Sequence, residues 1–555
     1  MCVLRPAEQI MTLSRLGSMH QTRLSFMRQL TRRMARENWR FSRPLFDIDE
    51  KGVGRAVYSV QTPKRSYSLV AFAHDLPAHM RTDRVIAQAW DATFTLFDGI
   101  PTTEDIERLA QAVPLQEAGR VSLRELSVSR ANRSVRLWDY CLDQLAQGLQ
   151  PRAQSLAEVG YLMRTTAVYG SAKLGAADRD MIKARPELKA PFQIEMLSVY
   201  LTRCFILDLL NHCAKAKGGA QAVALDHQLA QSLGVGNSTG LGMAPYIINH
   251  PQLFNNWILA KERAILRVRE LKRASQDECS LFDKLLSACQ QQVETWQSAH
   301  PVQIKKKEAL LDDLAQIRAY CTAQQLNKDY PWDGLLVWSQ KQLSEEGQEL
   351  IASIILEPYG ALVDELGADM SDDTDQAFQI DGAMKISAVK ALLERCYAWA
   401  FDKDWQAKEN IARLWYVSAE KLEPRLGERF DEPIADYEQP LAPARAASLA
   451  YKALLAWDED EAIASFLLKN PQHRLAVKRA QISQKAPYGE LKSNTISQEL
   501  MPIDMLRAKL SFFGATHFDP RSDRWVRIAM YKNAPYPQQL NASNADFWVY
   551  QGLSA

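Results

Sequence analysis

Four glycines fall within nine residues near the middle of the chain, directly before a segment of helical periodicity. They are Gly234, Gly236, Gly240 and Gly242. Closely spaced glycines let other groups approach the backbone and leave several N–H groups free to converge on an anion. The first turn of the helix expected at 247–273 would add its own unpaired N–H groups. This pattern predicts a loop at a helix N-terminus that binds a carboxylate or a phosphate.

A plain connection between two helices is the alternative interpretation of the same glycines. Residues 220–233 have helical periodicity, and Gly234 and Gly236 then stand where a helix C-cap belongs. The segment lacks the Lys-Ser/Thr ending of a P-loop. No strand is expected before it, as a dinucleotide-binding fingerprint would need. Both interpretations stay open from the sequence.

Helical periodicity dominates the chain after residue 104 and predicts a mainly α fold. The expected helices include 122–149, 154–169, 192–217 and 277–299. Strand-like runs occur near the two ends, at 56–60, 66–72, 91–97, 511–518 and 524–531. We expect a large multi-helix body with a small α+β portion, formed by an N-terminal hairpin that pairs with the C-terminal strands.

The predicted organisation has five parts. They are a basic arm at 1–43, a small α+β unit at 44–100, a helical body at 101–366 that carries the site, a second helical portion at 383–510 and a β segment at 511–555. The basic arm holds nine arginines against two glutamates. Such a start resembles an organelle transit peptide, and it could also contact an acidic partner or RNA. A solvated helix packed loosely on the body is the plainer interpretation.

Three side chains upstream of the glycines are candidates for acid/base chemistry. Lys173 lies among small residues, where a desolvated lysine can lose its proton and act as a base. Tyr169 is close to it in sequence. His212 shares a helix face with Cys204 and Asp208, because the three are four residues apart. An exposed lysine and a histidine satisfied by its helical neighbours are the structural alternatives, and no metal-binding motif accompanies the Cys, Asp and His.

Arginines and the polar residues of the glycine segment are candidates for holding the anion. Guanidinium groups bind carboxylates and phosphates through paired hydrogen bonds. The predicted ligand-binding residues are Arg130, Arg133, Arg164, Asn237, Ser238, Thr239 and Gly240. The alternative interpretation is that these arginines form a charged helix face and pair with acidic residues elsewhere in the chain.

Composition narrows the function classes. The net charge of +1 gives no overall field that would attract nucleic acid or a membrane, and no apolar run approaches the roughly 18 residues of a membrane span. Eight cysteines without a C-x-x-C pair are typical of buried thiols in a cytosolic protein.

These features together lead to two hypotheses. We expect a cytoplasmic enzyme that acts on a small anionic metabolite by acid/base chemistry, of the lyase or isomerase type. The rival hypothesis is a non-catalytic helical scaffold or regulatory protein, with a basic arm for RNA or a partner. The sequence identifies no cofactor, and it leaves room for a homo-oligomer.

Overall fold

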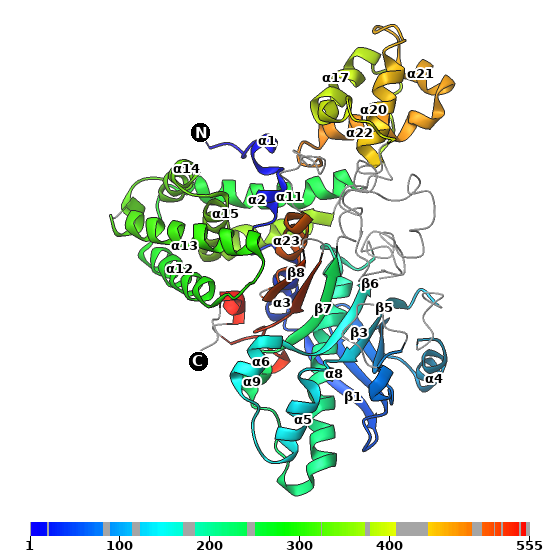
Figure 1. The fold of residues 1–555 in the computed structure, drawn as a ribbon, viewed down its shortest axis with the longest axis vertical. Coiled ribbons are helices and arrows are strands. Elements are labelled where there is room, and N and C mark those ends of the chain that lie inside the picture. Colours follow the sequence, from blue (N-terminus) through cyan, green and yellow to red (C-terminus); the bar gives the residue numbers. More distant parts are fainter. Residues whose placement is uncertain are drawn as a thin grey trace.

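The computed structural model describes residues 2–18, 21–80, 89–113, 122–169, 184–240, 250–323, 325–371, 378–406, 442–490, 502–515, 517–522, 525–542 and 545–550. Within these residues a large sheet lies beside a helical body, and a smaller helical bundle stands at the edge of the molecule (Figure 1).

A nine-stranded sheet is the centre of the fold, with the strand order β1-β2-β3-β4-β5-β6-β7-β9-β8. The strands are β1 Arg40–Ile48, β2 Gly54–Gln61, β3 Ser66–Ala73, β4 Ala92–Asp98, β5 Glu125–Arg133, β6 Tyr161–Tyr169, β7 Gly234–Gly240, β8 His517–Ser522 and β9 Trp525–Met530. Neighbouring strands are antiparallel, except β6 and β7, which are parallel. The expectation of a multi-helix protein with only a small α+β portion is therefore wrong.

Three strands lie where helices and a loop were expected. The expected helix 122–149 is β5 followed by α5 (Trp138–Ala146), and the expected helix 154–169 is α6 (Ala153–Val159) followed by β6. Strands in the middle of a sheet are buried on both faces, so they lack the alternation of apolar and polar residues that identifies a half-buried strand. α5 and α6 adjoin β5 and β6 in the sequence, so each helix and its strand together were predicted as one longer helix.

Gly234, Gly236 and Gly240 lie in the strand β7 and not in a loop, whereas Gly242 lies outside the described residues. Its backbone pairs with β6 on one side and with β9 on the other, so its N–H groups face neighbouring strands. A Cβ on Gly236 would lie 2.5 Å from the ring of Tyr161, and a Cβ on Gly234 would lie 2.3 Å from the carbonyl oxygen of Met530. These two glycines therefore let Tyr161 and the backbone of β9 approach β7 closely, which is a common role of glycine inside a strand.

The C-terminal strands join the sheet at the end opposite to the N-terminal hairpin. The expected hairpin is present as β2 and β3, but β9 pairs with β7 and β8, and four strands separate it from β3. Residues 502–513, which include the start of the expected strand 511–518, form the helix α23 (Pro502–Phe513). The predicted direct pairing of the early hairpin with the late strands is wrong.

The long helix α8 (Gln193–Gly218) packs against one face of the sheet. It is buried over most of its length, as expected of a helix that is apolar all round. Phe205 of α8 makes edge-to-face contacts with Tyr58 of β2 and Phe94 of β4. On the opposite face, α4 (Thr103–Ala112) covers a smaller apolar cluster of β2, β3 and β4. The main core therefore lies between α8 and the face of the sheet that it covers.

The remaining helices form a body and a bundle. The body contains α1 Ala7–Ile10, α2 Leu13–Leu16, α3 Phe26–Arg36, α11 Pro251–Arg269, α12 Gln276–Thr295, α13 Pro301–Thr322, α14 Pro331–Gln342, α15 Glu345–Ile354 and α16 Gly360–Val363. The short helix α9 (His227–Gln231) directly precedes β7 and lies near α6 in Figure 1. The bundle contains α17 Ile386–Tyr397, α20 Ala442–Leu454, α21 Ile463–Lys469 and α22 Arg474–Lys485, and it has an apolar core of its own. Among the described helices, none has the length and apolar content needed to span a membrane.

Most arginines of the expected basic arm form ion pairs, and four of the nine are buried. Arg5 forms ion pairs with Glu262 and Glu349, and Arg28 forms one with Glu357. These partners lie in the helical body, more than 250 residues away in sequence. A buried guanidinium needs such partners, because an unpaired charge in the interior is very costly. Residues of the expected arm therefore form part of the core.

Candidate functional site

The catalytic residues predicted from the sequence are placed as follows. Lys173 lies outside the described residues. Tyr169 is the last residue of β6 and pairs with Val128 of β5. On α8, a ring nitrogen of His212 is hydrogen-bonded at 2.9 Å to the carbonyl oxygen of Asp49, in the turn after β1. This bond ties α8 to the β1–β2 turn, which is a structural role.

The predicted ligand-binding arginines have different neighbours. Arg130 lies over the ring of Trp90 at 5.2 Å, whereas Arg133 lies over the ring of Trp138 at 4.8 Å. The third, Arg164, is buried in β6, opposite Gly236 of β7. Two of these guanidiniums thus stack on different tryptophans, and no sequence pattern predicted either stack.

The polar residues of the glycine segment lie in the sheet. Asn237 pairs with Thr165 of β6 and with Ile528 of β9. Ser238, Thr239 and Gly240 continue β7 and pair with Arg527, Val526 and Trp525 of β9. Because Gly236, and not Asn237, stands opposite Arg164, and successive residues of a strand point to opposite faces, the side chains of Asn237 and Arg164 lie on different faces of the sheet.

A cleft at the edge of the sheet is the best candidate for a functional site. It lies between β1, one face of α8 and the short turn η10 (Pro537–Gln539), and its volume is about 670 Å³. Four residues of α8 line it, namely Leu201, Cys204, Leu207 and Asp208. Their spacing places them along one side of the helix. The cleft is therefore built from segments far apart in the sequence.

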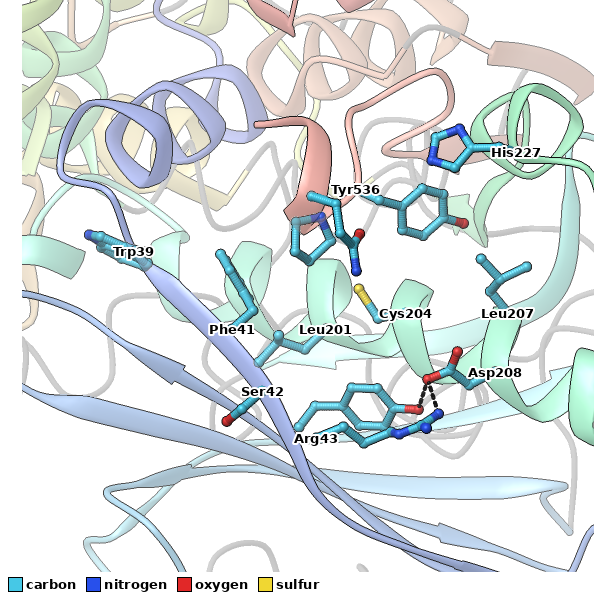
Figure 2. Close-up of a pocket in the computed structure, with 13 residues that line it drawn as sticks. Trp39, Phe41, Ser42, Arg43, Leu201, Cys204, Leu207, Asp208, His227 and Tyr536 are labelled. Atoms are coloured by element: carbon cyan, nitrogen blue, oxygen red, sulfur yellow. Dashed lines mark hydrogen bonds and ion pairs between the residues drawn. The ribbon is translucent and has the colours of Figure 1, made fainter. Parts of the chain in front are cut away.

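Aromatic side chains form its walls. Figure 2 shows Trp39 and Phe41 on one side and Tyr536 and His227 on the other, with the sulfur of Cys204 between them. Trp39 and Tyr536 are buried, whereas Phe41 is half-buried and His227 is exposed. Rings held in this way provide flat apolar surfaces that a planar ligand can contact.

Tyr536 is held in place by a buried cation. The guanidinium of Arg203 lies 4.1 Å from the centre of its ring. Arg203 itself donates hydrogen bonds of 2.7 to 2.9 Å to the carbonyl oxygens of Leu233, Ala534 and Gln231. Burial raises the pKa of Tyr536 to about 12, despite the opposing charge of Arg203. This wall is therefore rigid and uncharged.

Arg43, Asp208 and Tyr58 form the polar end of the cleft (Figure 2). One oxygen of Asp208, Oδ2, accepts hydrogen bonds from Arg43 at 2.8 Å and from the Tyr58 hydroxyl at 2.6 Å. Burial, and then the nearby charge of Asp208, raise the pKa of Tyr58 well above its usual value, so Tyr58 remains a donor. Arg43 and Asp208 are partly exposed, with side-chain exposures of 46% and 33%.

The thiol of Cys204 is not suited to nucleophilic attack. Burial raises its pKa to about 12, and the thiol donates a hydrogen bond to the carbonyl oxygen of Tyr200 at 3.5 Å. A protonated thiol is a poor nucleophile. Among the described residues, no group of three or more His, Cys, Asp or Glu side chains could hold a metal ion. The lining residues offer ring faces and charged hydrogen-bonding groups, which suit non-covalent binding.

Only part of this cleft could be predicted from the sequence. The four-residue spacing of Cys204 and Asp208 correctly places both on one face of α8. The aromatic walls were missed, because Trp39, Phe41 and Tyr536 come from opposite ends of the chain. Arg43 was counted with the basic arm. The alternation of Trp39 and Phe41 at the start of β1 was the one local signal that two rings would share a face.

No known protein family, curated protein or solved structure matches this chain. The cleft is therefore interpreted from its own geometry.

Proposed function

We propose that this protein binds a small, planar, anionic metabolite in the cleft between β1 and α8. The observation that carries the proposal is the combination of aromatic walls with the Arg43 guanidinium in a cavity of about 670 Å³. Cavities of roughly 300–1,000 Å³, with apolar walls and a few polar groups, are typical of small-molecule sites. We also propose a cytoplasmic location, supported by eight cysteines that are all free thiols.

The walls favour a ligand that contains a ring. The rings of Trp39, Phe41 and Tyr536 all line the cleft (Figure 2), so a ligand that contains a ring can pack against them. Offset or edge-to-face ring contacts contribute about 0.5–1.5 kcal/mol each beyond the burial of area. An aliphatic ligand of the same charge lacks this contribution and should bind more weakly.

Arg43 favours an acidic group on that ligand. A guanidinium has five N–H donors, and the hydrogen bond to Asp208 uses Nη1 of Arg43. The remaining donors can hold a carboxylate or a phosphate beside the ring walls. Asp208 keeps the guanidinium in position, but its own charge repels the ligand. The two residues therefore have opposite effects on the affinity for an anion.

The experiment compares aromatic acids with neutral ligands of the same shape. Benzoate, indole carboxylates and nucleoside monophosphates are screened by thermal shift against benzamide and aliphatic carboxylates, because a ligand that binds only the folded state raises its apparent stability. Affinities are then measured by calorimetry. We expect Arg43→Gln to weaken binding by about 10- to 100-fold, which corresponds to a charge-assisted hydrogen bond of about 1.5–3 kcal/mol. Asp208→Asn is expected to tighten binding.

Arg124→Gln is the matched control. Arg124 is 51% exposed, lies over the ring of Phe97 at 4.2 Å and pairs with Asp105 at 3.4 Å. Arg43 likewise lies over a ring, that of Phe46, at 4.7 Å and pairs with one aspartate, so Arg124 has a similar environment outside the cleft. This variant should bind the ligand like the parent. If no aromatic acid raises the melting temperature, the proposal is wrong. Weaker binding in Asp208→Asn and tighter binding in Arg43→Gln would show that the cleft selects a cation.

A further inference from the structure

The bundle of α17, α20, α21 and α22 is joined to the body at one end. After α22, the backbone N–H of Tyr488 donates to the side chain of Asn255 on α11 at 3.0 Å, and the Tyr488 hydroxyl donates to the carbonyl oxygen of Arg5 at 2.7 Å. Figure 1 shows α21 on the side of the bundle away from α11. The side formed by α21 and the turns around it therefore stands clear of the body.

Large apolar side chains are exposed on this side. Leu468 at the end of α21 is 85% exposed, Leu475 at the start of α22 is 76% exposed, and Leu455 after α20 is 58% exposed. Among the described residues, Leu468 is the most exposed large apolar side chain. Single exposed leucines are common on protein surfaces, but Leu468 and Leu475 belong to neighbouring segments, because the ring of His473 stacks on that of Phe466 at 5.6 Å.

Charges of opposite sign accompany these leucines. Lys469 and Arg474 are exposed and adjoin Leu468 and Leu475, and together the four residues form what we call the basic leucine face. The turn 458–461 is exposed and consists of Asp458, Glu459, Asp460 and Glu461, and we call it the acidic turn.

The acidic turn keeps a net negative charge. Lys385 pairs with Asp460 at 2.7 Å and Lys390 pairs with Glu459 at 2.6 Å. Four carboxylates thus stand against two lysines. The turn therefore still attracts a basic surface.

The acidic turn and the basic leucine face are neighbours on the bundle. The ammonium group of Lys469 lies 5.0 Å from the ring centre of Trp457, the residue directly before the acidic turn. Trp457 in turn packs edge to face on Phe466 of α21 at 5.4 Å. The two charged surfaces are thus held side by side by the packing of α21.

We propose that this side of the bundle is the interface of a homodimer. Adjacent patches of opposite charge are complementary to themselves across a two-fold axis, because each acidic turn then meets the partner's basic face while each basic face meets the partner's acidic turn. The leucines supply the apolar centre that such an interface needs. This proposal is independent of the ligand-binding cleft, which lies on the sheet.

The test is the oligomeric state of the full chain, measured by sedimentation velocity over a range of protein concentrations. The parent is expected to form a species of about twice the chain mass of 62.8 kDa, and to dissociate as the salt concentration rises, because charges near the surface are screened. Two charge-reversed variants are compared with it, Lys469→Glu with Arg474→Glu, and Asp460→Lys with Glu461→Lys. Each is expected to be monomeric alone, and an equal mixture of the two is expected to form a heterodimer.

A third variant tests the apolar centre. Leu468→Ser with Leu475→Ser removes exposed side chains only, so it should melt like the parent while its dimer dissociation constant rises by about 30-fold or more, as for interface hot spots. A parent that is monomeric at every concentration would overturn the proposal and would assign this face to a different protein. A mixture of charge-reversed variants that stays monomeric, or a dimer that persists in the leucine variant, would also overturn it.

Discussion

Replacement of Glu357 by glutamine tests how the buried charges hold the ends of the chain to the body. The side chain of Glu357 has no exposed surface, and neither has that of its partner Arg28. Its carboxylate accepts hydrogen bonds from Arg28 at 2.5 and 2.7 Å, from Arg23 at 3.2 Å and from the hydroxyl of Tyr550 at 2.9 Å. Glutamine has nearly the same shape, but it loses the charge and one acceptor oxygen.

The loss of stability in this variant depends on the guanidinium of Arg28, which stays buried without its acidic partner. Arg23 keeps its ion pairs with Asp364 and Asp546 in the variant, whereas Glu357 is the only acid among the described residues that forms an ion pair with Arg28. Removal of one member of a buried ion pair typically costs about 3–5 kcal/mol, because an uncompensated charge remains in the interior. We expect Glu357→Gln to lower the free energy of unfolding by that amount.

Urea unfolding of parent and variants measures this loss. Glu365→Gln is the control, because Glu365 is 69% exposed and pairs with Arg267 at the surface, where an ion pair contributes about 0–1 kcal/mol. A double variant, Arg28→Met with Glu357→Gln, removes the stranded charge and should be more stable than Glu357→Gln alone. A loss in Glu357→Gln no larger than that in the control, or strictly additive effects in the double variant, would refute the reasoning.

The same pair predicts a dependence on pH. Burial raises the pKa of Glu357, but the charge and hydrogen bonds of Arg28, with Arg23, outweigh it, so that the pKa is lowered overall from the ordinary value of 4.5. Because the folded state then binds the proton more weakly than the unfolded state, the stabilisation is complete above about pH 4.5 and is lost as the pH falls through the folded-state pKa. The difference in stability between parent and Glu357→Gln should shrink in that acidic range.

Three further outcomes follow from buried groups. Gly236→Ala should lower the stability by about 1–3 kcal/mol, because the new Cβ would lie 2.5 Å from the ring of Tyr161, and a thermal melt measures it. Burial raises the pKa of Cys141 to about 12, so a disulfide reagent at pH 8 should label it quickly only after unfolding in urea. Burial lowers the pKa of Lys532 from 10.5 to about 8. The folded state therefore binds fewer protons between these values, and the stability of the parent should rise with pH there more steeply than that of Lys532→Met.

The sequence predicted the elements whose apolar residues follow one regular pattern along their whole length. The hairpin of β2 and β3 was visible as two β-rich runs, and α8 was visible from its helical spacing. β5, β6 and β7 were not, because mid-sheet strands lack alternation and because β7 is composed mainly of glycine and small polar residues. The glycines were interpreted as an anion-binding loop, although close contact with Tyr161 explains the one at position 236.

The candidate site was predictable only where one helix supplies it. Cys204 and Asp208 share a face of α8, and their spacing shows this without a structure. The rings opposite them come from residues 39–41 and 536, and no local pattern connects these positions. A cleft between distant segments depends on the sheet order, which the sequence did not provide.

The buried arginines explain why the start of the chain looked like a separate arm. In a local view residues 1–43 are basic and nearly without acids. Their acidic partners lie in the body, and Asp546 and Tyr550 near the other end contact the same arginines. Charge balance is thus reached only in three dimensions. Neither Arg28 nor Glu357 is stable in the interior without its partner, so the N-terminal segment and the body must fold together. The cleft depends on that joint folding, because one of its walls begins at Trp39.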